Sequence, residues 1–151
     1  MRDPDCKRVA GLGDVSKVLS FAEGFQWNAA TRRIYKEDSE SNWQGVSRTS
    51  LVGGGDGIAV PFHLRYFEVA AGGFSSREKH AHQHVVVIVR GSGTVLLGNQ
   101  ERPIGFGDVV YVAPWEVHQF RNADGSEPLG FLCVVPAGRD VPVPVREDST
   151  D

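Results

Sequence analysis

Several large classes of protein are excluded by what this sequence lacks. Only two of its 151 residues are cysteine, and Cys6 and Cys133 form no CxxC pair, so neither a zinc ribbon nor a redox dithiol is supported. The longest apolar run, residues 85–89, is too short to span a bilayer. The formal net charge is −3 and the basic residues are scattered, which argues against nucleic-acid binding. The charged N-terminus contains no apolar segment of the signal-peptide type, so we expect a cytoplasmic protein.

Turn-forming residues are abundant, with 18 glycines and 8 prolines. Between the turns lie short segments rich in β-branched and aromatic residues, which favour strands. This regular alternation predicts an all-β barrel or sandwich. Near the N-terminus, Val15, Val18, Leu19 and Ala22 have the spacing of one short amphipathic helix. The predicted strands cover residues 46–51, 63–70, 85–89, 94–97, 109–112, 118–121 and 129–135.

The chain divides into three parts by composition. Residues 44–138 contain the predicted strands and form the barrel. Residues 1–43 form an N-terminal extension that packs on its own barrel or on that of a partner. Residues 139–151 begin with alternating valine and proline and end in charged residues, so we expect an extended or disordered tail.

Four of the five histidines lie in two places, with His80, His82 and His84 at alternate positions and His118 further along the chain. Alternate residues of a strand share a face, so Glu78 would join the first three if the segment is extended. A solvated polar edge is the alternative, but the apolar run that follows directly disfavours it. A mixed carboxylate and imidazole set suits a divalent transition metal, either Zn, Fe, Mn, Ni or Cu, with Zn or Fe favoured.

These residues resemble the first motif of the cupin superfamily, G-x5-H-x-H-x3,4-E-x6-G. Counting from Gly72 to Gly91, every spacing matches, but Glu78 stands where the family has its first histidine and His84 where it has glutamate. In this register His82 is a residue of the bend between the ligands. The rival register, with His80 and His82 as the paired histidines, breaks the spacing to Gly91.

The second cupin motif, G-x5-P-x-G-x2-H-x3-N, is similar to the segment from Gly107 to Asn122. Ala113 replaces the proline and Trp115 replaces the second glycine. The resemblance implies a cupin fold, a double-stranded β-helix or jelly-roll barrel, with an N-terminal extension. It also implies one metal per chain held by Glu78, His80, His84 and His118, with His82 as the substitute for Glu78 in the rival register.

A cupin metal site with an open position implies an enzyme that acts on a small molecule in the barrel mouth. The chemistry is that of an oxygenase or of a Lewis-acid lyase or isomerase. Glu78, His82, Tyr66 and Arg65 are the candidate catalytic residues, since a proton-transfer group and a substrate anchor are both needed.

Two other functions stay open at this point. The chain is similar to the cupin part of hydrazine synthetases, which use zinc to rearrange an O-acylated N-hydroxyamine and form an N–N bond. A non-catalytic cupin that binds a small ligand or a metal is the alternative from another class. An apolar outer barrel face needs cover, so we expect a homodimer that could also bury Trp27 and Trp43.

Overall fold

The computed structural model describes residues 16–37, 41–123 and 125–147. Within these ranges the chain is built from strands, turns and irregular segments, and contains no helix. Consequently, no described helix is long and apolar enough to cross a membrane.

All seven segments predicted from the sequence as strands are strands in the structure, several of them longer than predicted. The strands are β1 (Phe21–Ala22), β2 (Gln26–Trp27), β3 (Arg32–Ile34), β4 (Gln44–Val52), β5 (Phe62–Phe74), β6 (Glu78–Lys79), β7 (His84–Arg90), β8 (Ser92–Leu97), β9 (Gln100–Gly105), β10 (Val109–Val112), β11 (His118–Arg121), β12 (Leu129–Pro136) and β13 (Val143–Pro144).

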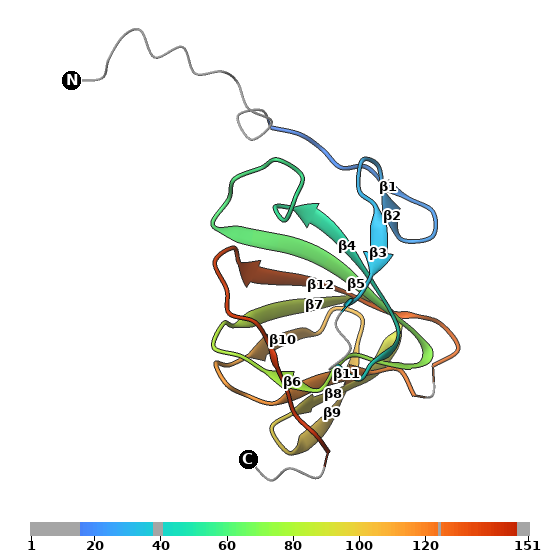
Figure 1. The fold of residues 1–151 in the computed structure, drawn as a ribbon. Coiled ribbons are helices and arrows are strands. Elements are labelled where there is room, and N and C mark those ends of the chain that lie inside the picture. Colours follow the sequence, from blue (N-terminus) through green and yellow to red (C-terminus); the bar gives the residue numbers. More distant parts are fainter. Residues whose placement is uncertain (1–15, 38–40, 124, 148–151) are drawn as a thin grey trace, which may run out of the picture.

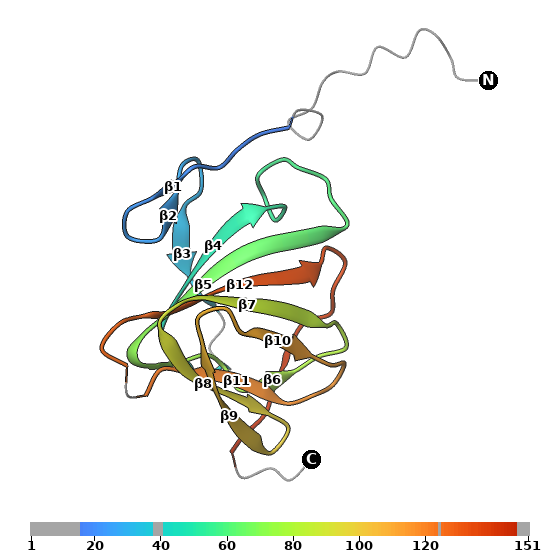
Figure 2. The same cartoon turned by 180° about the vertical axis from the view of Figure 1, so that it is seen from behind.

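Eleven of the described strands form one antiparallel sheet that curls into a barrel (Figures 1 and 2). Strand β5 is central, because it pairs with β4 on one side and with β12 on the other, and its end reaches β11. Strand β12 then pairs with β7, and β7 with β10. The sheet is therefore continuous around the cavity, as the all-β cupin prediction requires.

The barrel interior is filled by apolar side chains at alternate strand positions. On β7, for example, Val86 and Ile88 are fully buried, while Val85, which points away from the interior, is exposed. Each fully buried side chain of this size contributes about 1.5–3 kcal/mol to folding. The turn after β7 requires glycine, because Gly91 has a φ of 64° and a side chain there would collide with the carbonyl oxygen of Pro128.

The amphipathic helix predicted near the N-terminus is not formed by the described residues of that segment, so the prediction is wrong for them. Val15 lies outside the described residues. Residues 16–20 are irregular, and β1 and β2 form a hairpin that lies against the outside of the barrel (Figure 1). The hairpin is held by aromatic contacts, since Trp27 lies 5.0 Å from the ring of Tyr66. Aromatic packing thus outweighs the helical spacing.

The N-terminal extension also contributes directly to the sheet, since β3 pairs with β4. Trp43 packs edge-on against Tyr35 at 5.5 Å and joins the core. Trp27 and Trp43, which we expected a dimer interface to bury, therefore both pack against residues of their own chain. Within the described part of the tail, β13 pairs with β6.

Candidate metal centre

Three histidines converge from separate parts of the barrel. His80 follows β6, His84 begins β7 and His118 begins β11. The Nε2 atom of His80 lies 2.8 Å from that of His84 and 3.2 Å from that of His118. His80 and His118 are buried and His84 is partly buried.

The other ring nitrogen of each histidine fixes the orientation of its ring. Nδ1 of His80 lies 2.7 Å from the carbonyl oxygen of His82, and Nδ1 of His118 lies 2.9 Å from that of Glu116. A carbonyl oxygen only accepts, so both Nδ1 atoms carry the proton. When the rings of His80 and His118 are neutral, their Nε2 atoms then carry lone pairs that point toward each other.

Burial keeps these rings neutral. Burial and the neighbouring His118 lower the pKa of His80 to about 4. Burial also lowers the pKa values of His84 and His118 below the ordinary range. Neutral imidazole is the form of histidine that binds a metal.

The three residues fit a divalent transition metal. Two lone pairs that face each other repel, and a cation between them removes the repulsion. Ligands at about 2.0–2.1 Å from a zinc-like ion are themselves about 2.9–3.4 Å apart, close to the observed separations. His80, His84 and His118 form a group whose ligand atoms all lie within 4.8 Å of one another. The metal-binding site is thus supported by the donor set, and the identity of the metal is not determined by it.

The two sequence motifs meet in space and hold this arrangement. The backbone N–H of Gly72 donates to the carbonyl of Asn122, at 2.7 Å, and the N–H of Asn122 donates to the carbonyl of Gly73. Trp115 stands where the motif has glycine and adopts a φ of 63°, the left-handed conformation for which glycine is favoured. Its N–H donates to the carbonyl of His80 at 2.7 Å, so this strained turn positions a metal ligand.

Glu78 lies in the same cavity, but other groups engage its carboxylate. Lys36 forms an ion pair with it and Ser76 Oγ donates to it at 2.8 Å. Its charge opposes the lowering of the pKa values of His80 and His118, which places it close to both. It does not belong to the group of three nitrogen ligands. A role for Glu78 as fourth ligand or as catalytic base stays a prediction.

His82 lies at the bend between His80 and His84, where the spacing to Gly91 places it. Its ring stacks on that of His80, with 3.6 Å between centroids, and its Nδ1 lies 2.8 Å from Asp140 Oδ1. Asp140 also accepts from the backbone N–H groups of Ala81 and His82, bonds that hold its pKa well below the ordinary range. The aspartate of the tail therefore clamps the loop that carries His80, a contact that no sequence pattern indicates.

Arg65 and Tyr66 are neighbours on β5 and so point to opposite faces. Arg65 lines the cavity, where its guanidinium lies 3.5 Å from Cys133 Sγ. Tyr66 is buried on the outer face under the N-terminal hairpin, and its hydroxyl donates to Glu68 at 2.9 Å. This placement gives no support to a catalytic role for Tyr66, because successive strand residues cannot both face the interior.

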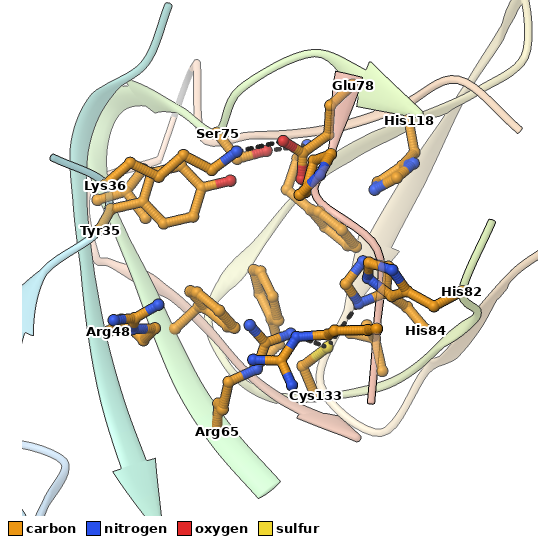
Figure 3. A pocket seen from close by; sticks show the side chains of 17 residues that line it. Tyr35, Lys36, Arg48, Arg65, Ser75, Glu78, His82, His84, His118 and Cys133 are labelled. Atoms are coloured by element: carbon orange, nitrogen blue, oxygen red, sulfur yellow. Dashed lines mark hydrogen bonds and ion pairs between the residues drawn. The ribbon is translucent and has the colours of Figure 1, made fainter. Parts of the chain in front are cut away.

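The cavity beside the histidines has a volume of about 220 Å³, and residues of six strands line it. Figure 3 shows the lining side chains. Strand β6 contributes Glu78, and each of the other five strands contributes two residues at alternate positions, in agreement with the two-residue period of a strand. The lining residues that the sequence did not predict include Arg48, Arg139 and Cys133, whose Sγ lies 2.9 Å from His84 Nδ1. The pairs of alternate lining residues, one pair from each of the five strands, are Val46 and Arg48, Arg65 and Phe67, His84 and Val86, His118 and Phe120, and Phe131 and Cys133.

Comparison with known proteins agrees with this architecture. Residues 65–135 match the cupin domain family. A structure from Rhodopseudomonas palustris, a cupin 2 conserved barrel domain protein, superposes with a TM-score of 0.77 and 38% identity over 87% of this chain and 88% of that one. A cupin-2 domain from Rhodospirillum rubrum gives a TM-score of 0.71 and 36% identity over 87% and 84%. The chain belongs to the cupin family.

Among characterised proteins, this chain is similar to an enzyme of Rhodospirillum rubrum. That protein is 1-methylthio-D-xylulose 5-phosphate methylsulfurylase, with 37% identity over 129 residues, which are 85% of this chain and 80% of the relative. The likeness therefore extends well beyond the two motifs.

Proposed function

We propose that this chain is a metal-dependent enzyme whose substrate is a small sulfur-containing sugar phosphate, of the kind named for the Rhodospirillum rubrum relative. The observation that carries the proposal is the convergence of three imidazole Nε2 atoms beside a small cavity. His80, His84 and His118 would hold a divalent metal, and that metal would supply Lewis-acid chemistry at a carbonyl oxygen, such as the ketone of a xylulose. Zn and Fe stay the favoured metals.

The cavity also suits a methylthio group. Phe67, Phe120 and Phe131 line it and pack on one another, with ring centroids 4.4 Å apart for Phe120 and Phe131 and 5.5 Å apart for Phe67 and Phe131. Aromatic rings interact favourably with thioether sulfur. These rings would therefore hold the methylthio end of a substrate and exclude water from it.

Proton transfer is assigned to residues next to the histidines. The Glu78 carboxylate, which Lys36 and Ser76 orient, would move a proton at a substrate carbon or oxygen. His82, held by Asp140 at the cavity wall, is the second candidate. Both groups are positioned by contacts from distant parts of the chain.

The test combines metal content with turnover. Purified wild-type protein should hold about one transition metal per chain by mass spectrometry and should consume 1-methylthio-D-xylulose 5-phosphate. His118→Ala should lose both, whereas His63→Ala, a histidine outside the group, should keep the metal. Stoichiometric metal without this turnover would remove the proposed substrate, and oxygen uptake or N–N bond formation would then identify one of the other cupin reactions. Ligand binding that His118→Ala leaves intact would favour a non-catalytic role.

We also propose a homodimer that acts in the cytoplasm. Val85, Tyr111 and Val134 are exposed neighbours on the outer face, because Val85 pairs with Tyr111 on β10 and with Val134 on β12. A second copy of the chain would cover this apolar surface. Sedimentation should give a dimer at micromolar concentration, and Tyr111→Glu should shift it to monomer. A monomeric wild-type protein contradicts the proposal.

A further inference from the structure

Three arginines line the same cavity as the histidines. Arg48 comes from β4, Arg65 from β5 and Arg139 from the segment after β12. All three are partly buried. In Figure 3, Arg48 and Arg65 lie on the side of the cavity away from His118. The cavity therefore has a histidine wall and a separate arginine wall.

The arginine wall has no matching negative charge. Among the described residues, none of the three arginines forms an ion pair with a carboxylate. Arg65 contacts Cys133 Sγ and lies over the ring of Phe67 at 4.8 Å, and Arg139 donates to the carbonyl of Pro136 at 3.0 Å. The Glu78 carboxylate, on the opposite side of the cavity in Figure 3, is engaged by Lys36.

Some of the donors on this wall also lack acceptors. The Nε atoms of Arg48 and Arg65 are buried and have no hydrogen-bond partner in the part of the chain that the structure describes. Burial, together with the charge of Arg65, lowers the pKa values of both Arg48 and Arg139. Uncompensated cations and orphaned donors cost stability, so their persistence in one cavity indicates a ligand that satisfies them.

The chemistry of this wall selects a phosphate over a carboxylate. A guanidinium presents several N–H donors in a planar fork and binds phosphate oxygens in pairs. A phosphomonoester carries about −1.5 to −2 charge near neutral pH and three acceptor oxygens. A carboxylate offers one charge and two oxygens, so it would neutralise less of the positive charge of the wall and accept from fewer of its donors.

We propose that Arg48, Arg65 and Arg139 form a phosphate-binding subsite that holds the phosphomonoester end of a small substrate across the cavity from the three histidines. A molecule anchored there by its phosphate extends toward the metal centre with its other end. The link to catalysis rests on the proposed function, but phosphate binding itself needs no metal.

The experiment measures the binding of inorganic phosphate to the full chain by isothermal titration calorimetry, with chelator present and at constant ionic strength. The wild-type protein should bind phosphate, and Arg48→Gln and Arg65→Gln should each weaken binding by 10-fold or more. Arg102→Gln, which removes an exposed arginine on β9, is the matched control and should bind as wild type does. His118→Ala should also bind phosphate normally.

Three results would overturn the subsite. These are unchanged binding in both Arg48→Gln and Arg65→Gln, an equal loss in Arg102→Gln, and binding of acetate as tight as that of phosphate. Thermal unfolding of each variant checks that the barrel is intact, and Arg65→Lys, which keeps the charge but loses the planar fork, should bind with intermediate affinity.

The two proposals can fail separately. Absence of bound metal with arginine-dependent phosphate binding would remove the proposed function and keep the subsite. Metal binding and turnover that persist at full rate in Arg65→Gln, together with unchanged phosphate affinity, would remove the subsite and keep the enzyme.

Discussion

Strand β5 has an arginine cluster on each of its two faces. On the outer face, Arg32 and Arg90 form ion pairs with Glu68 at 3.3 and 3.0 Å, and the hydroxyl of Tyr66 donates to the same carboxylate. On the inner face, Arg65 lies with two other arginines in a cavity whose Glu78 carboxylate is engaged by Lys36. In the outer cluster both arginines contact a carboxylate, and Arg32, which also donates to the carbonyl of Gly24, fastens the N-terminal hairpin. The inner arginines have no carboxylate partner among the described residues and are therefore available to a ligand.

The largest stability effect is expected from removing the shared acceptor of the outer face. Glu68→Ala leaves Arg32 and Arg90 without their ion-pair partner and the buried Tyr66 hydroxyl without its acceptor. We expect a loss of about 2 kcal/mol in the free energy of unfolding, at the low end for a broken pair because both arginines are partly solvated. Urea denaturation measures it. A loss below about 0.5 kcal/mol would show that the outer cluster does not stabilise the barrel.

Removing the hydroxyl of Tyr66 separates the contribution of hydrogen bonding to stability from that of aromatic packing on the outer face. Tyr66→Phe keeps the contacts with Phe25 and Trp27 but removes the donor to Glu68. We expect a loss of about 1.5 kcal/mol, the lower range for a hydrogen bond to a charged group. The metal content should not change, because this side chain faces away from the histidines. A loss of metal would place Tyr66 in the site after all.

The inner face should respond in the opposite direction. Arg48→Gln removes a charge that repels Arg65 and has no carboxylate partner among the described residues. We expect the free energy of unfolding to rise by about 1 kcal/mol in phosphate-free buffer, in contrast to the outer-face variants. Chemical denaturation of wild type and variant at low ionic strength tests the sign. A loss as large as that of Glu68→Ala would show that the two faces do not differ in kind.

The smallest effect is expected from a conservative change at the outer cluster. Arg90→Lys keeps the charge beside Glu68 but loses the planar group that lies 4.6 Å from the ring of Phe25. We expect a loss of about 0.5 kcal/mol, typical of an exposed cation–π contact. Thermal unfolding of Arg90→Lys, measured alongside that of Glu68→Ala, compares the two losses of stability. An equal loss in both variants would assign the stability to the guanidinium geometry rather than to charge.

The sequence predicts the strands that carry the metal site and misses the contacts that close the cavity. The β-branched run and the motif spacings identify β7 and place His84 on it. Strand β9 was missed because Pro103 and charged residues lower its strand propensity. Among the described strands β9 pairs with β8 alone, so it tolerates proline at an edge. Two-residue strands such as β6 and β13 carry no periodicity to recognise.

The arginine wall could not be predicted for a different reason. Arg48 and Arg65 come together because β4 pairs with β5, and Arg139 joins them from the segment that follows β12. Period-two alternation does state that Arg65 and Tyr66 face opposite ways, but not which of them faces inward. Core packing decides that, because Phe67 and Val69 are buried in the core and Arg65 lies on the same face of β5 as both of them.

The segment after β12 has a consequence for how the protein matures. Arg139 lines the cavity, Asp140 clamps the loop of His80 and β13 pairs with β6, and all three follow the last strand of the barrel wall in the chain. During synthesis, the wall strands emerge from the ribosome before these residues do. Because Asp140 holds the loop that carries His80 while Arg139 lines the cavity, the metal centre and the arginine wall are both completed only when this last segment has folded.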